Sequence, residues 1–105
     1  MNNIEKIRKA MQEQCTLNLT YKKMVKKSIS SETKDYFGVE PYEIRGDRLW
    51  VFDPAVNHVR NLVLREDAPQ EGIIFCKVNE NQKFKPRYAI KGVNGDMLKE
   101  PEAQT

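Results

Sequence analysis

Histidine and cysteine are scarce in this chain, which limits the chemistry it can perform. The only histidine is His58, and the two cysteines, Cys15 and Cys76, lie far apart in the sequence. Zinc sites need Cys or His ligands at short spacings, and neither cysteine has such a neighbour, so we expect no metal site. General-base catalysis by His58 would need a second group to orient its ring, and the sequence identifies none. We expect His58 to be an exposed loop residue.

Long hydrophobic runs are also absent, since none approaches the roughly 20 residues of a membrane span. Residues 1–14 carry charges throughout, unlike a secretion signal. We therefore expect a cytoplasmic protein with no membrane association. In that reducing compartment Cys15 and Cys76 are expected to be free thiols in or beside the core. The alternative is a disulfide, which would need oxidising surroundings and Cα atoms within about 7 Å.

Catalytic and cofactor-binding motifs are missing as well. The carboxylates are scattered, with no pair at a spacing typical of acid–base catalysis, and there is no glycine-rich phosphate loop. The sequence therefore predicts a protein that is not an enzyme and has no cofactor. Its 105 residues, of which 39% are hydrophobic and 31% charged, suit one globular domain. We expect this domain to cover residues 1–92 and a flexible C-terminal tail to cover residues 93–105.

Positive charge is in slight excess and unevenly distributed. The formal net charge is +3, with twelve Lys and Arg against eight Asp and Glu in residues 1–65, and six against seven in residues 66–105. This bias is weaker than that of a dedicated DNA-binding domain. Lysines on an exposed strand prevent edge-to-edge aggregation, so the densest cluster is either a solvated strand edge or a phosphate-contacting surface. That cluster consists of Lys22, Lys23, Lys26 and Lys27.

Residues 3–14 have the periodicity of a short amphipathic helix. Apolar residues recur at helical spacing from Ile4 to Met11, and charged residues fill the other face. The side chain of Asn2 or Asn3 can cap the first turn. A helix this short is not stable alone, so we expect its apolar stripe to pack on the rest of the domain.

The following sequence is dominated by short apolar runs separated by turns. Pro41 cannot donate a backbone hydrogen bond, which places its strand at an edge or beside a bulge, and Gly46-Asp47 predicts a hairpin turn. Five or six short antiparallel strands close most economically into a small barrel. The predicted fold is therefore mainly β: a Sm-like, SH3-type barrel over residues 15–92 with an N-terminal helix. The expected strands cover residues 17–21, 36–45, 49–52, 58–64, 73–78 and 88–90.

Residues 49–52 form the most apolar run and are expected to be the central strand. Alternation places Trp50 and Phe52 on one face of that strand, and Leu49 and Val51 on the other. We expect Trp50 to belong to the core rather than to form a base-stacking platform.

The strands resemble those of the WYL domain, a Sm-like barrel common in bacterial regulators and defence-associated proteins. The name-giving tripeptide Trp-Tyr-Leu corresponds here to Leu49-Trp50-Val51, and Phe37 stands where the family usually has an Arg. The resemblance implies a ligand- or nucleic-acid-binding surface formed by polar and basic side chains. The similar segments are residues 17–21 (LNLTY), 39–44 (VEPYEI), 49–53 (LWVFD) and 60–65 (RNLVLR).

The leading hypothesis is a regulatory binding module without enzymatic activity, whose ligand is nucleic acid or a nucleotide. The planar guanidinium of Arg suits phosphate, and Tyr rings can stack on bases. For Arg60 and Arg65 the alternative is a surface ion pair with a nearby acidic residue. Phosphate contacts are expected from Lys22, Lys23, Lys26, Lys27, Arg45, Arg48, Arg60 and Arg65, and stacking from Tyr21 or Tyr42.

A second hypothesis is a protein–protein interaction module, such as a small inhibitor or adaptor. It would dock through a sheet edge or the N-terminal helix, because strand addition to an exposed edge is a general recognition mode. Self-assembly into a homo-oligomeric ring is a third hypothesis, which follows from the Sm-like architecture alone. The three hypotheses differ in which side chains the fold brings together.

Overall fold

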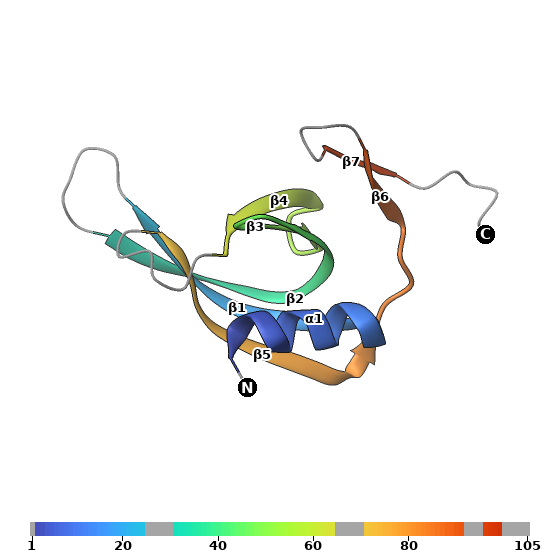
Figure 1. Ribbon diagram of the computed structural model, residues 1–105, viewed down its shortest axis with the longest axis horizontal. Coiled ribbons are helices and arrows are strands. Elements are labelled where there is room, and N and C mark those ends of the chain that lie inside the picture. The colour runs from blue at the N-terminus through green and yellow to red at the C-terminus, as the bar shows by residue number, and fades with distance from the viewer. Residues whose placement is uncertain (1, 25–30, 65–70, 92–95, 100–105) are drawn as a thin grey trace.

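The computed structural model describes residues 2–24, 31–64, 71–91 and 96–99, which contain one helix and seven strands. The predicted class, mainly β with an N-terminal helix, is confirmed (Figure 1). No helix in these ranges is long and apolar enough to cross a membrane. The elements are α1 (Asn3–Glu13), β1 (Cys15–Met24), β2 (Ser31–Arg45), β3 (Arg48–Asp53), β4 (His58–Val63), β5 (Gly72–Lys83), β6 (Tyr88–Lys91) and β7 (Asp96–Lys99).

Strands β1 to β5 form one antiparallel sheet in the order β4-β3-β2-β1-β5. The prediction that residues 49–52 form the central strand is wrong, because β3 lies beside the edge strand β4 and β2 is central. Lys22 and Lys23 do not mark a sheet edge either, since β1 lies between β2 and β5. The strand of Pro41 is interior, and the pairing with β3 shifts register between Pro41 and Glu43, which confirms the bulge.

The sheet is strongly curved along β2. This strand pairs with β1 as far as Val39 and with β3 from Glu40 onward, and Gly38, with φ 65°, lies in the bulge of the β1 pairing just before this change of partner. This left-handed backbone conformation favours glycine. Figure 1 shows β2 curving so that β3 and β4 lie over β1. Within the described residues β4 pairs only with β3 and β5 only with β1, so the sheet is open and the predicted barrel closure is not confirmed.

Helix α1 packs on the inner side of the curved sheet. The side-chain Oδ1 of Asn2 accepts a hydrogen bond from a first-turn amide at 2.8 Å, as predicted for the cap. Ile7 and Ala10 are fully buried, and Ile4 and Met11 pack against the same core. The predicted helix and its apolar stripe are confirmed.

The main core lies between the inner face of the sheet and α1. Leu49 and Val51 belong to it, whereas Trp50 and Phe52 are buried outside this cluster, on the opposite face of β3. The predicted alternation is therefore confirmed, and Trp50 is 7% exposed rather than an open platform. The buried members of the main core are Ile7, Ala10, Cys15, Leu17, Leu19, Tyr21, Tyr36, Val39, Leu49, Val51, Leu62, Leu64, Ile73 and Cys76.

Strands β6 and β7 form a separate two-stranded ribbon, which Figure 1 shows apart from the five-stranded sheet. The pairing runs from Tyr88 opposite Lys99 to Lys91 opposite Asp96. Strand β7 lies within residues 93–105, which the sequence predicts to be a tail, so regular structure continues to Lys99. The last six residues of that segment, 100–105, lie outside the described residues.

Candidate functional site

The side chains predicted to contact phosphate are divided between different parts of the sheet. Arg45 and Arg48 are cross-strand partners beside the β2–β3 turn, and Arg48 shares its face of β3 with Trp50. Arg60 is the cross-strand partner of Val51, so it lies on the opposite face, toward the core. Three further predicted residues, Lys26, Lys27 and Arg65, lie outside the described residues.

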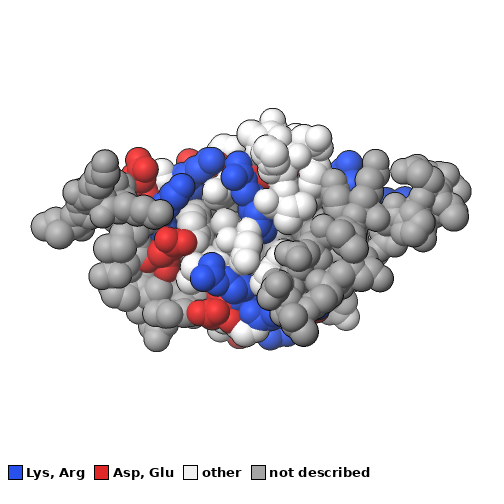
Figure 2. All heavy atoms as spheres, turned by 90° about the horizontal axis from the view of Figure 1, so that it is seen from above, with Lys and Arg blue, Asp and Glu red and all other residues white. Residues whose placement is uncertain are grey.

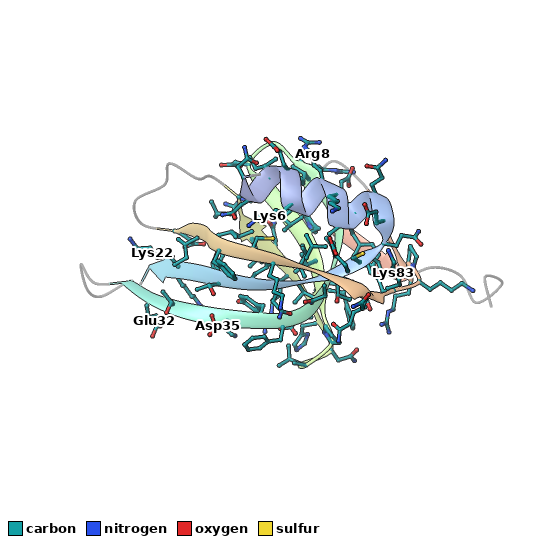
Figure 3. The ribbon with its side chains drawn as sticks, turned by 90° about the horizontal axis from the view of Figure 1, so that it is seen from below. Lys6, Arg8, Lys22, Glu32, Asp35 and Lys83 are labelled. Atoms are coloured by element: carbon teal, nitrogen blue, oxygen red, sulfur yellow. The ribbon has the colours of Figure 1, made fainter. Side chains whose placement is uncertain are left out.

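Lys22 and Lys23 lie near the C-terminal end of β1, where acidic residues offset their charge. The cross-strand partner of Lys23 is Glu32, and the hydroxyl of Thr20 donates to Asp35 Oδ1 at 2.8 Å. Figure 3 shows Lys22, Glu32 and Asp35 at the same end of the sheet. A surface of mixed sign attracts a polyanion less than lysines alone. This end of β1 is therefore a weak candidate for phosphate binding.

Tyr21 belongs to the core and does not present its ring for the predicted stacking on bases. It is only 4% exposed. Its hydroxyl accepts a hydrogen bond from the Val63 amide at 3.0 Å and donates one to Glu71 Oε2 at 2.5 Å. Burial, and then the bond to Glu71, raises the pKa of Tyr21 to about 12. Tyr21 thus connects β1 to the edge strand β4, which is a structural role.

Tyr42 holds the segment that follows β5 against β2. Its hydroxyl donates to Glu40 Oε1 at 2.7 Å and accepts from the Arg87 amide at 3.2 Å, and its ring centroid lies 5.6 Å from that of Phe84. Arg87 binds the buried Glu40 carboxylate through Nε and Nη2, and its guanidinium lies 4.8 Å from the ring centroid of Phe52. Burial, more than any hydrogen bond, raises the pKa of Tyr42. Both the ring and the hydroxyl are engaged inside the molecule, which leaves little of Tyr42 for stacking.

Arg60 has the surroundings best suited to an anion. Its guanidinium lies 5.9 Å from the ring centroid of Tyr36, and Nζ of Lys34 lies 5.0 Å from the same centroid. The Nε atom of Arg60 is buried and has no hydrogen-bond partner among the described residues. Asp53 Oδ2 lies 3.8 Å from it, within reach of an ion pair but beyond a hydrogen bond. We call Lys34, Tyr36, Asp53 and Arg60 the Arg60 site.

The Arg60 site combines two cations with one buried carboxylate. Asp53 is 4% exposed, and its Oδ1 accepts a hydrogen bond from the Ala55 amide at 3.1 Å. Burial raises the pKa of Tyr36, and the charge of Arg60 opposes that rise. Figure 2, viewed from the side of β3 and β4, shows Lys and Arg side chains on both sides of an uncharged strip, with Asp and Glu nearby. Positive charge on this face is therefore local rather than continuous.

A pocket between α1 and β5 was not expected from the sequence. Its volume is about 280 Å³. The indication that could have revealed it is the run Ile73-Ile74-Phe75, because a strand with one buried face cannot bury three successive large apolar side chains. The pocket is lined by Lys6, Lys9, Phe75, Cys76, Lys77, Val78 and Glu80.

Three further reactive side chains are Cys15, Cys76 and His58. Cys15 and Cys76 are free and buried, as expected, and burial raises the pKa of the Cys76 thiol to about 11. His58 is exposed at the first position of β4 rather than in a loop. Within the described ranges, no group of three His, Cys, Asp or Glu side chains could hold a metal ion.

Comparison of the chain with protein-family models, with curated proteins and with solved structures found no match. The resemblance to the WYL domain therefore stays a prediction that depends on the strand segments quoted above. The structure itself shows an N-terminal helix and five antiparallel strands in one sheet, which is a less specific description than a WYL domain.

Proposed function

We propose that this chain is a non-enzymatic, WYL-like regulatory binding module that binds nucleic acid or a nucleotide through a phosphate group at the Arg60 site. The observation that carries the proposal is the buried Nε of Arg60, which has no hydrogen-bond partner among the described residues. A buried donor without a partner costs about 1–3 kcal/mol. The Arg60 side chain as a whole is 31% exposed, so a shift of this side chain toward the surface would let a phosphate oxygen supply the missing acceptor. Arg is also the side chain whose donor geometry best matches phosphate.

Lys34 supports a phosphate rather than a smaller ligand. Its ammonium and the Arg60 guanidinium both lie over the Tyr36 ring, and in the proposed complex each contacts an oxygen of the phosphate group. Asp53 offsets one of these charges. We therefore expect moderate affinity with a clear dependence on salt concentration.

The Sm-type architecture is part of the proposal. Its support is the strand order, which places β4 and β5 at the two ends of a curved sheet, where pairing between them would close a barrel. The hydroxyl of Tyr21 already bonds to the outer strand β4. In this arrangement Arg60 lies on the inner face of β4, and β4 is the strand whose free edge would pair with β5 to close the barrel.

Titration of the full chain with ATP and with short single-stranded RNA and DNA, each at low and at high salt, tests the proposal. We expect binding that weakens as salt rises, and loss of binding in Arg60→Gln and in Lys34→Gln. Arg60→Lys keeps the charge but not the planar donors, so its affinity should be intermediate.

Two matched variants serve as controls. Arg8→Gln removes an exposed arginine of α1, and Lys85→Gln removes an exposed lysine after β5. Both should bind like the unmodified chain, and thermal unfolding should confirm that every variant is folded. Absence of binding at the lowest salt would refute the proposed function. An equal loss in Arg8→Gln and Arg60→Gln would move the site away from Arg60.

A further inference from the structure

Strand β5 exposes two large apolar side chains in succession. Ile73 is 3% exposed and Cys76 is 1% exposed, but Ile74 and Phe75 between them are 54% and 53% exposed. This break in alternation coincides with a register shift against β1, in which Ile74 is the extra residue. Bulges of this kind are common near functional sites because they redirect side chains. Here the bulge brings apolar surface to the outside of the sheet.

The pocket beside Phe75 is formed by one face of α1 and by β5. Lys6 and Lys9 come from the helix, and Phe75, Lys77 and Val78 are among the residues that come from the strand. The ammonium of Lys6 lies 5.9 Å from the Phe75 ring centroid. Figure 3 shows Lys6 where α1 lies beside β5. The pocket thus has an apolar wall next to cationic groups.

The charge of this pocket is positive, because three lysines and one glutamate line it. Glu80 is bonded to Lys9 at 3.2 Å. The ammonium of Lys6 donates to the Cys76 carbonyl at 3.3 Å, which holds it at the rim. Lys77 is exposed and faces no acidic partner within the pocket lining. A ligand that complements this surface therefore carries negative charge beside an apolar group.

Simple strand addition at this part of β5 is impeded by the helix. The Nδ2 atom of Asn3 contacts the Ile73 carbonyl at 3.5 Å, and Lys6 Nζ contacts the Cys76 carbonyl at 3.3 Å. These side chains occupy backbone acceptors that an added strand would need. A partner would therefore enter the groove with its side chains rather than extend the sheet at these two residues.

We infer that the groove between α1 and β5 binds an acidic segment of a partner protein. An apolar side chain of that segment packs against Phe75 and Val78, and flanking Asp or Glu residues face the three lysines. The exposed Ile74 extends the apolar surface and favours a protein over nucleic acid, because bases stack on aromatic rings and gain little from aliphatic side chains. The groove is formed by different strands from the Arg60 site, so this inference does not depend on the proposed function.

Selection from a displayed library of random peptides, with the full chain as bait, tests the inference. We expect the selected sequences to carry Asp or Glu on both sides of Phe, Leu or Ile. A synthetic peptide of the consensus sequence should shift the amide resonances of Phe75 and Val78 in NMR spectra. Phe75→Ser and Lys77→Glu should each weaken its binding by about tenfold, the usual cost of removing a central contact.

Matched controls replace similar groups elsewhere on the surface. Val56→Ser removes an apolar side chain that is 46% exposed in the β3–β4 turn, and Lys85→Glu reverses the charge of an exposed lysine. Both variants should bind the peptide like the unmodified chain. No enrichment of acidic, apolar sequences would refute the inference. The inference would also be refuted if the peptide left these resonances unchanged while a single-stranded oligonucleotide, or a second copy of the chain, shifted them.

Discussion

The two outer strands of the sheet satisfy their exposed backbone groups in different ways. On β4, the Val63 amide donates to the hydroxyl of Tyr21, whose ring is buried in the main core. On β5, the Ile73 and Cys76 carbonyls accept from Asn3 and Lys6, which are flexible polar side chains of α1. One edge is thus bonded by a buried ring hydroxyl from inside the molecule and the other by partly exposed side chains of the helix.

This difference separates stability from binding. A buried aromatic hydroxyl loses little entropy on forming its bonds, because packing already fixes the ring, so the β4 contact contributes to folding. The long side chain of Lys6 must be ordered to reach its acceptor, so the contact adds little stability and can be exchanged for a ligand. We expect the β4 side to respond to mutation through folding, and the β5 side through association.

The largest effect is expected for Tyr21→Ala. This substitution removes a buried ring and the bonds to Val63 and Glu71, so the free energy of unfolding should fall by about 3–5 kcal/mol. Tyr21→Phe keeps the ring and removes only the hydroxyl, which should cost about 1 kcal/mol. Urea denaturation followed by circular dichroism measures both. If Tyr21→Phe were as stable as the unmodified chain, the hydroxyl would not connect β1 to β4 and the comparison would fail.

Alkaline pH provides a second test of the same hydroxyl. Burial, followed by the bond to Glu71, raises the pKa of Tyr21 from 10.0 to about 12, so the folded state favours the neutral phenol. The resulting stabilisation is fully present below the unfolded pKa and is lost as the pH rises through the folded pKa. The stability difference between the unmodified chain and Tyr21→Phe should therefore shrink between about pH 10 and pH 12. Urea midpoints measured across this range would contradict the assignment if that difference stayed constant.

The parts of the fold that depend on neighbouring residues could be predicted from the sequence. The helix follows from apolar residues at helical spacing and from the cap at Asn2, and the turn follows from Gly46, which adopts φ 58°. The order of the strands could not be predicted, because β5 returns from far along the chain to pair with β1. That pairing makes β1 interior and removes Lys22 from the predicted edge. Periodicity records which face a residue occupies but not which strand lies beside it.

The candidate site was predictable only in part, for the same reason. The chemistry of Arg60 indicates an anion contact, and alternation along its strand is consistent with its place opposite Val51. Its approach to Tyr36 and Lys34 depends on the curvature of β2, which no local pattern indicates. The burial of Tyr21 could not be predicted, because a tyrosine in a strand has the same sequence pattern whether its hydroxyl contacts solvent or a distant backbone amide.

The smallest effect on stability is expected on the β5 side, for the double variant Asn3→Ala and Lys6→Ala. Both side chains are partly exposed, so the free energy of unfolding should change by less than about 0.5 kcal/mol. The substitutions free the Ile73 and Cys76 carbonyls for pairing with another strand, and an unprotected edge promotes association. Light scattering over a range of protein concentrations should therefore detect more association than in the unmodified chain.

Arg8→Ala, on an exposed position of the same helix, is the control and should leave association unchanged. If the double variant stayed as monodisperse as the control, α1 would not protect this edge, and the functional difference between the two outer strands would be lost.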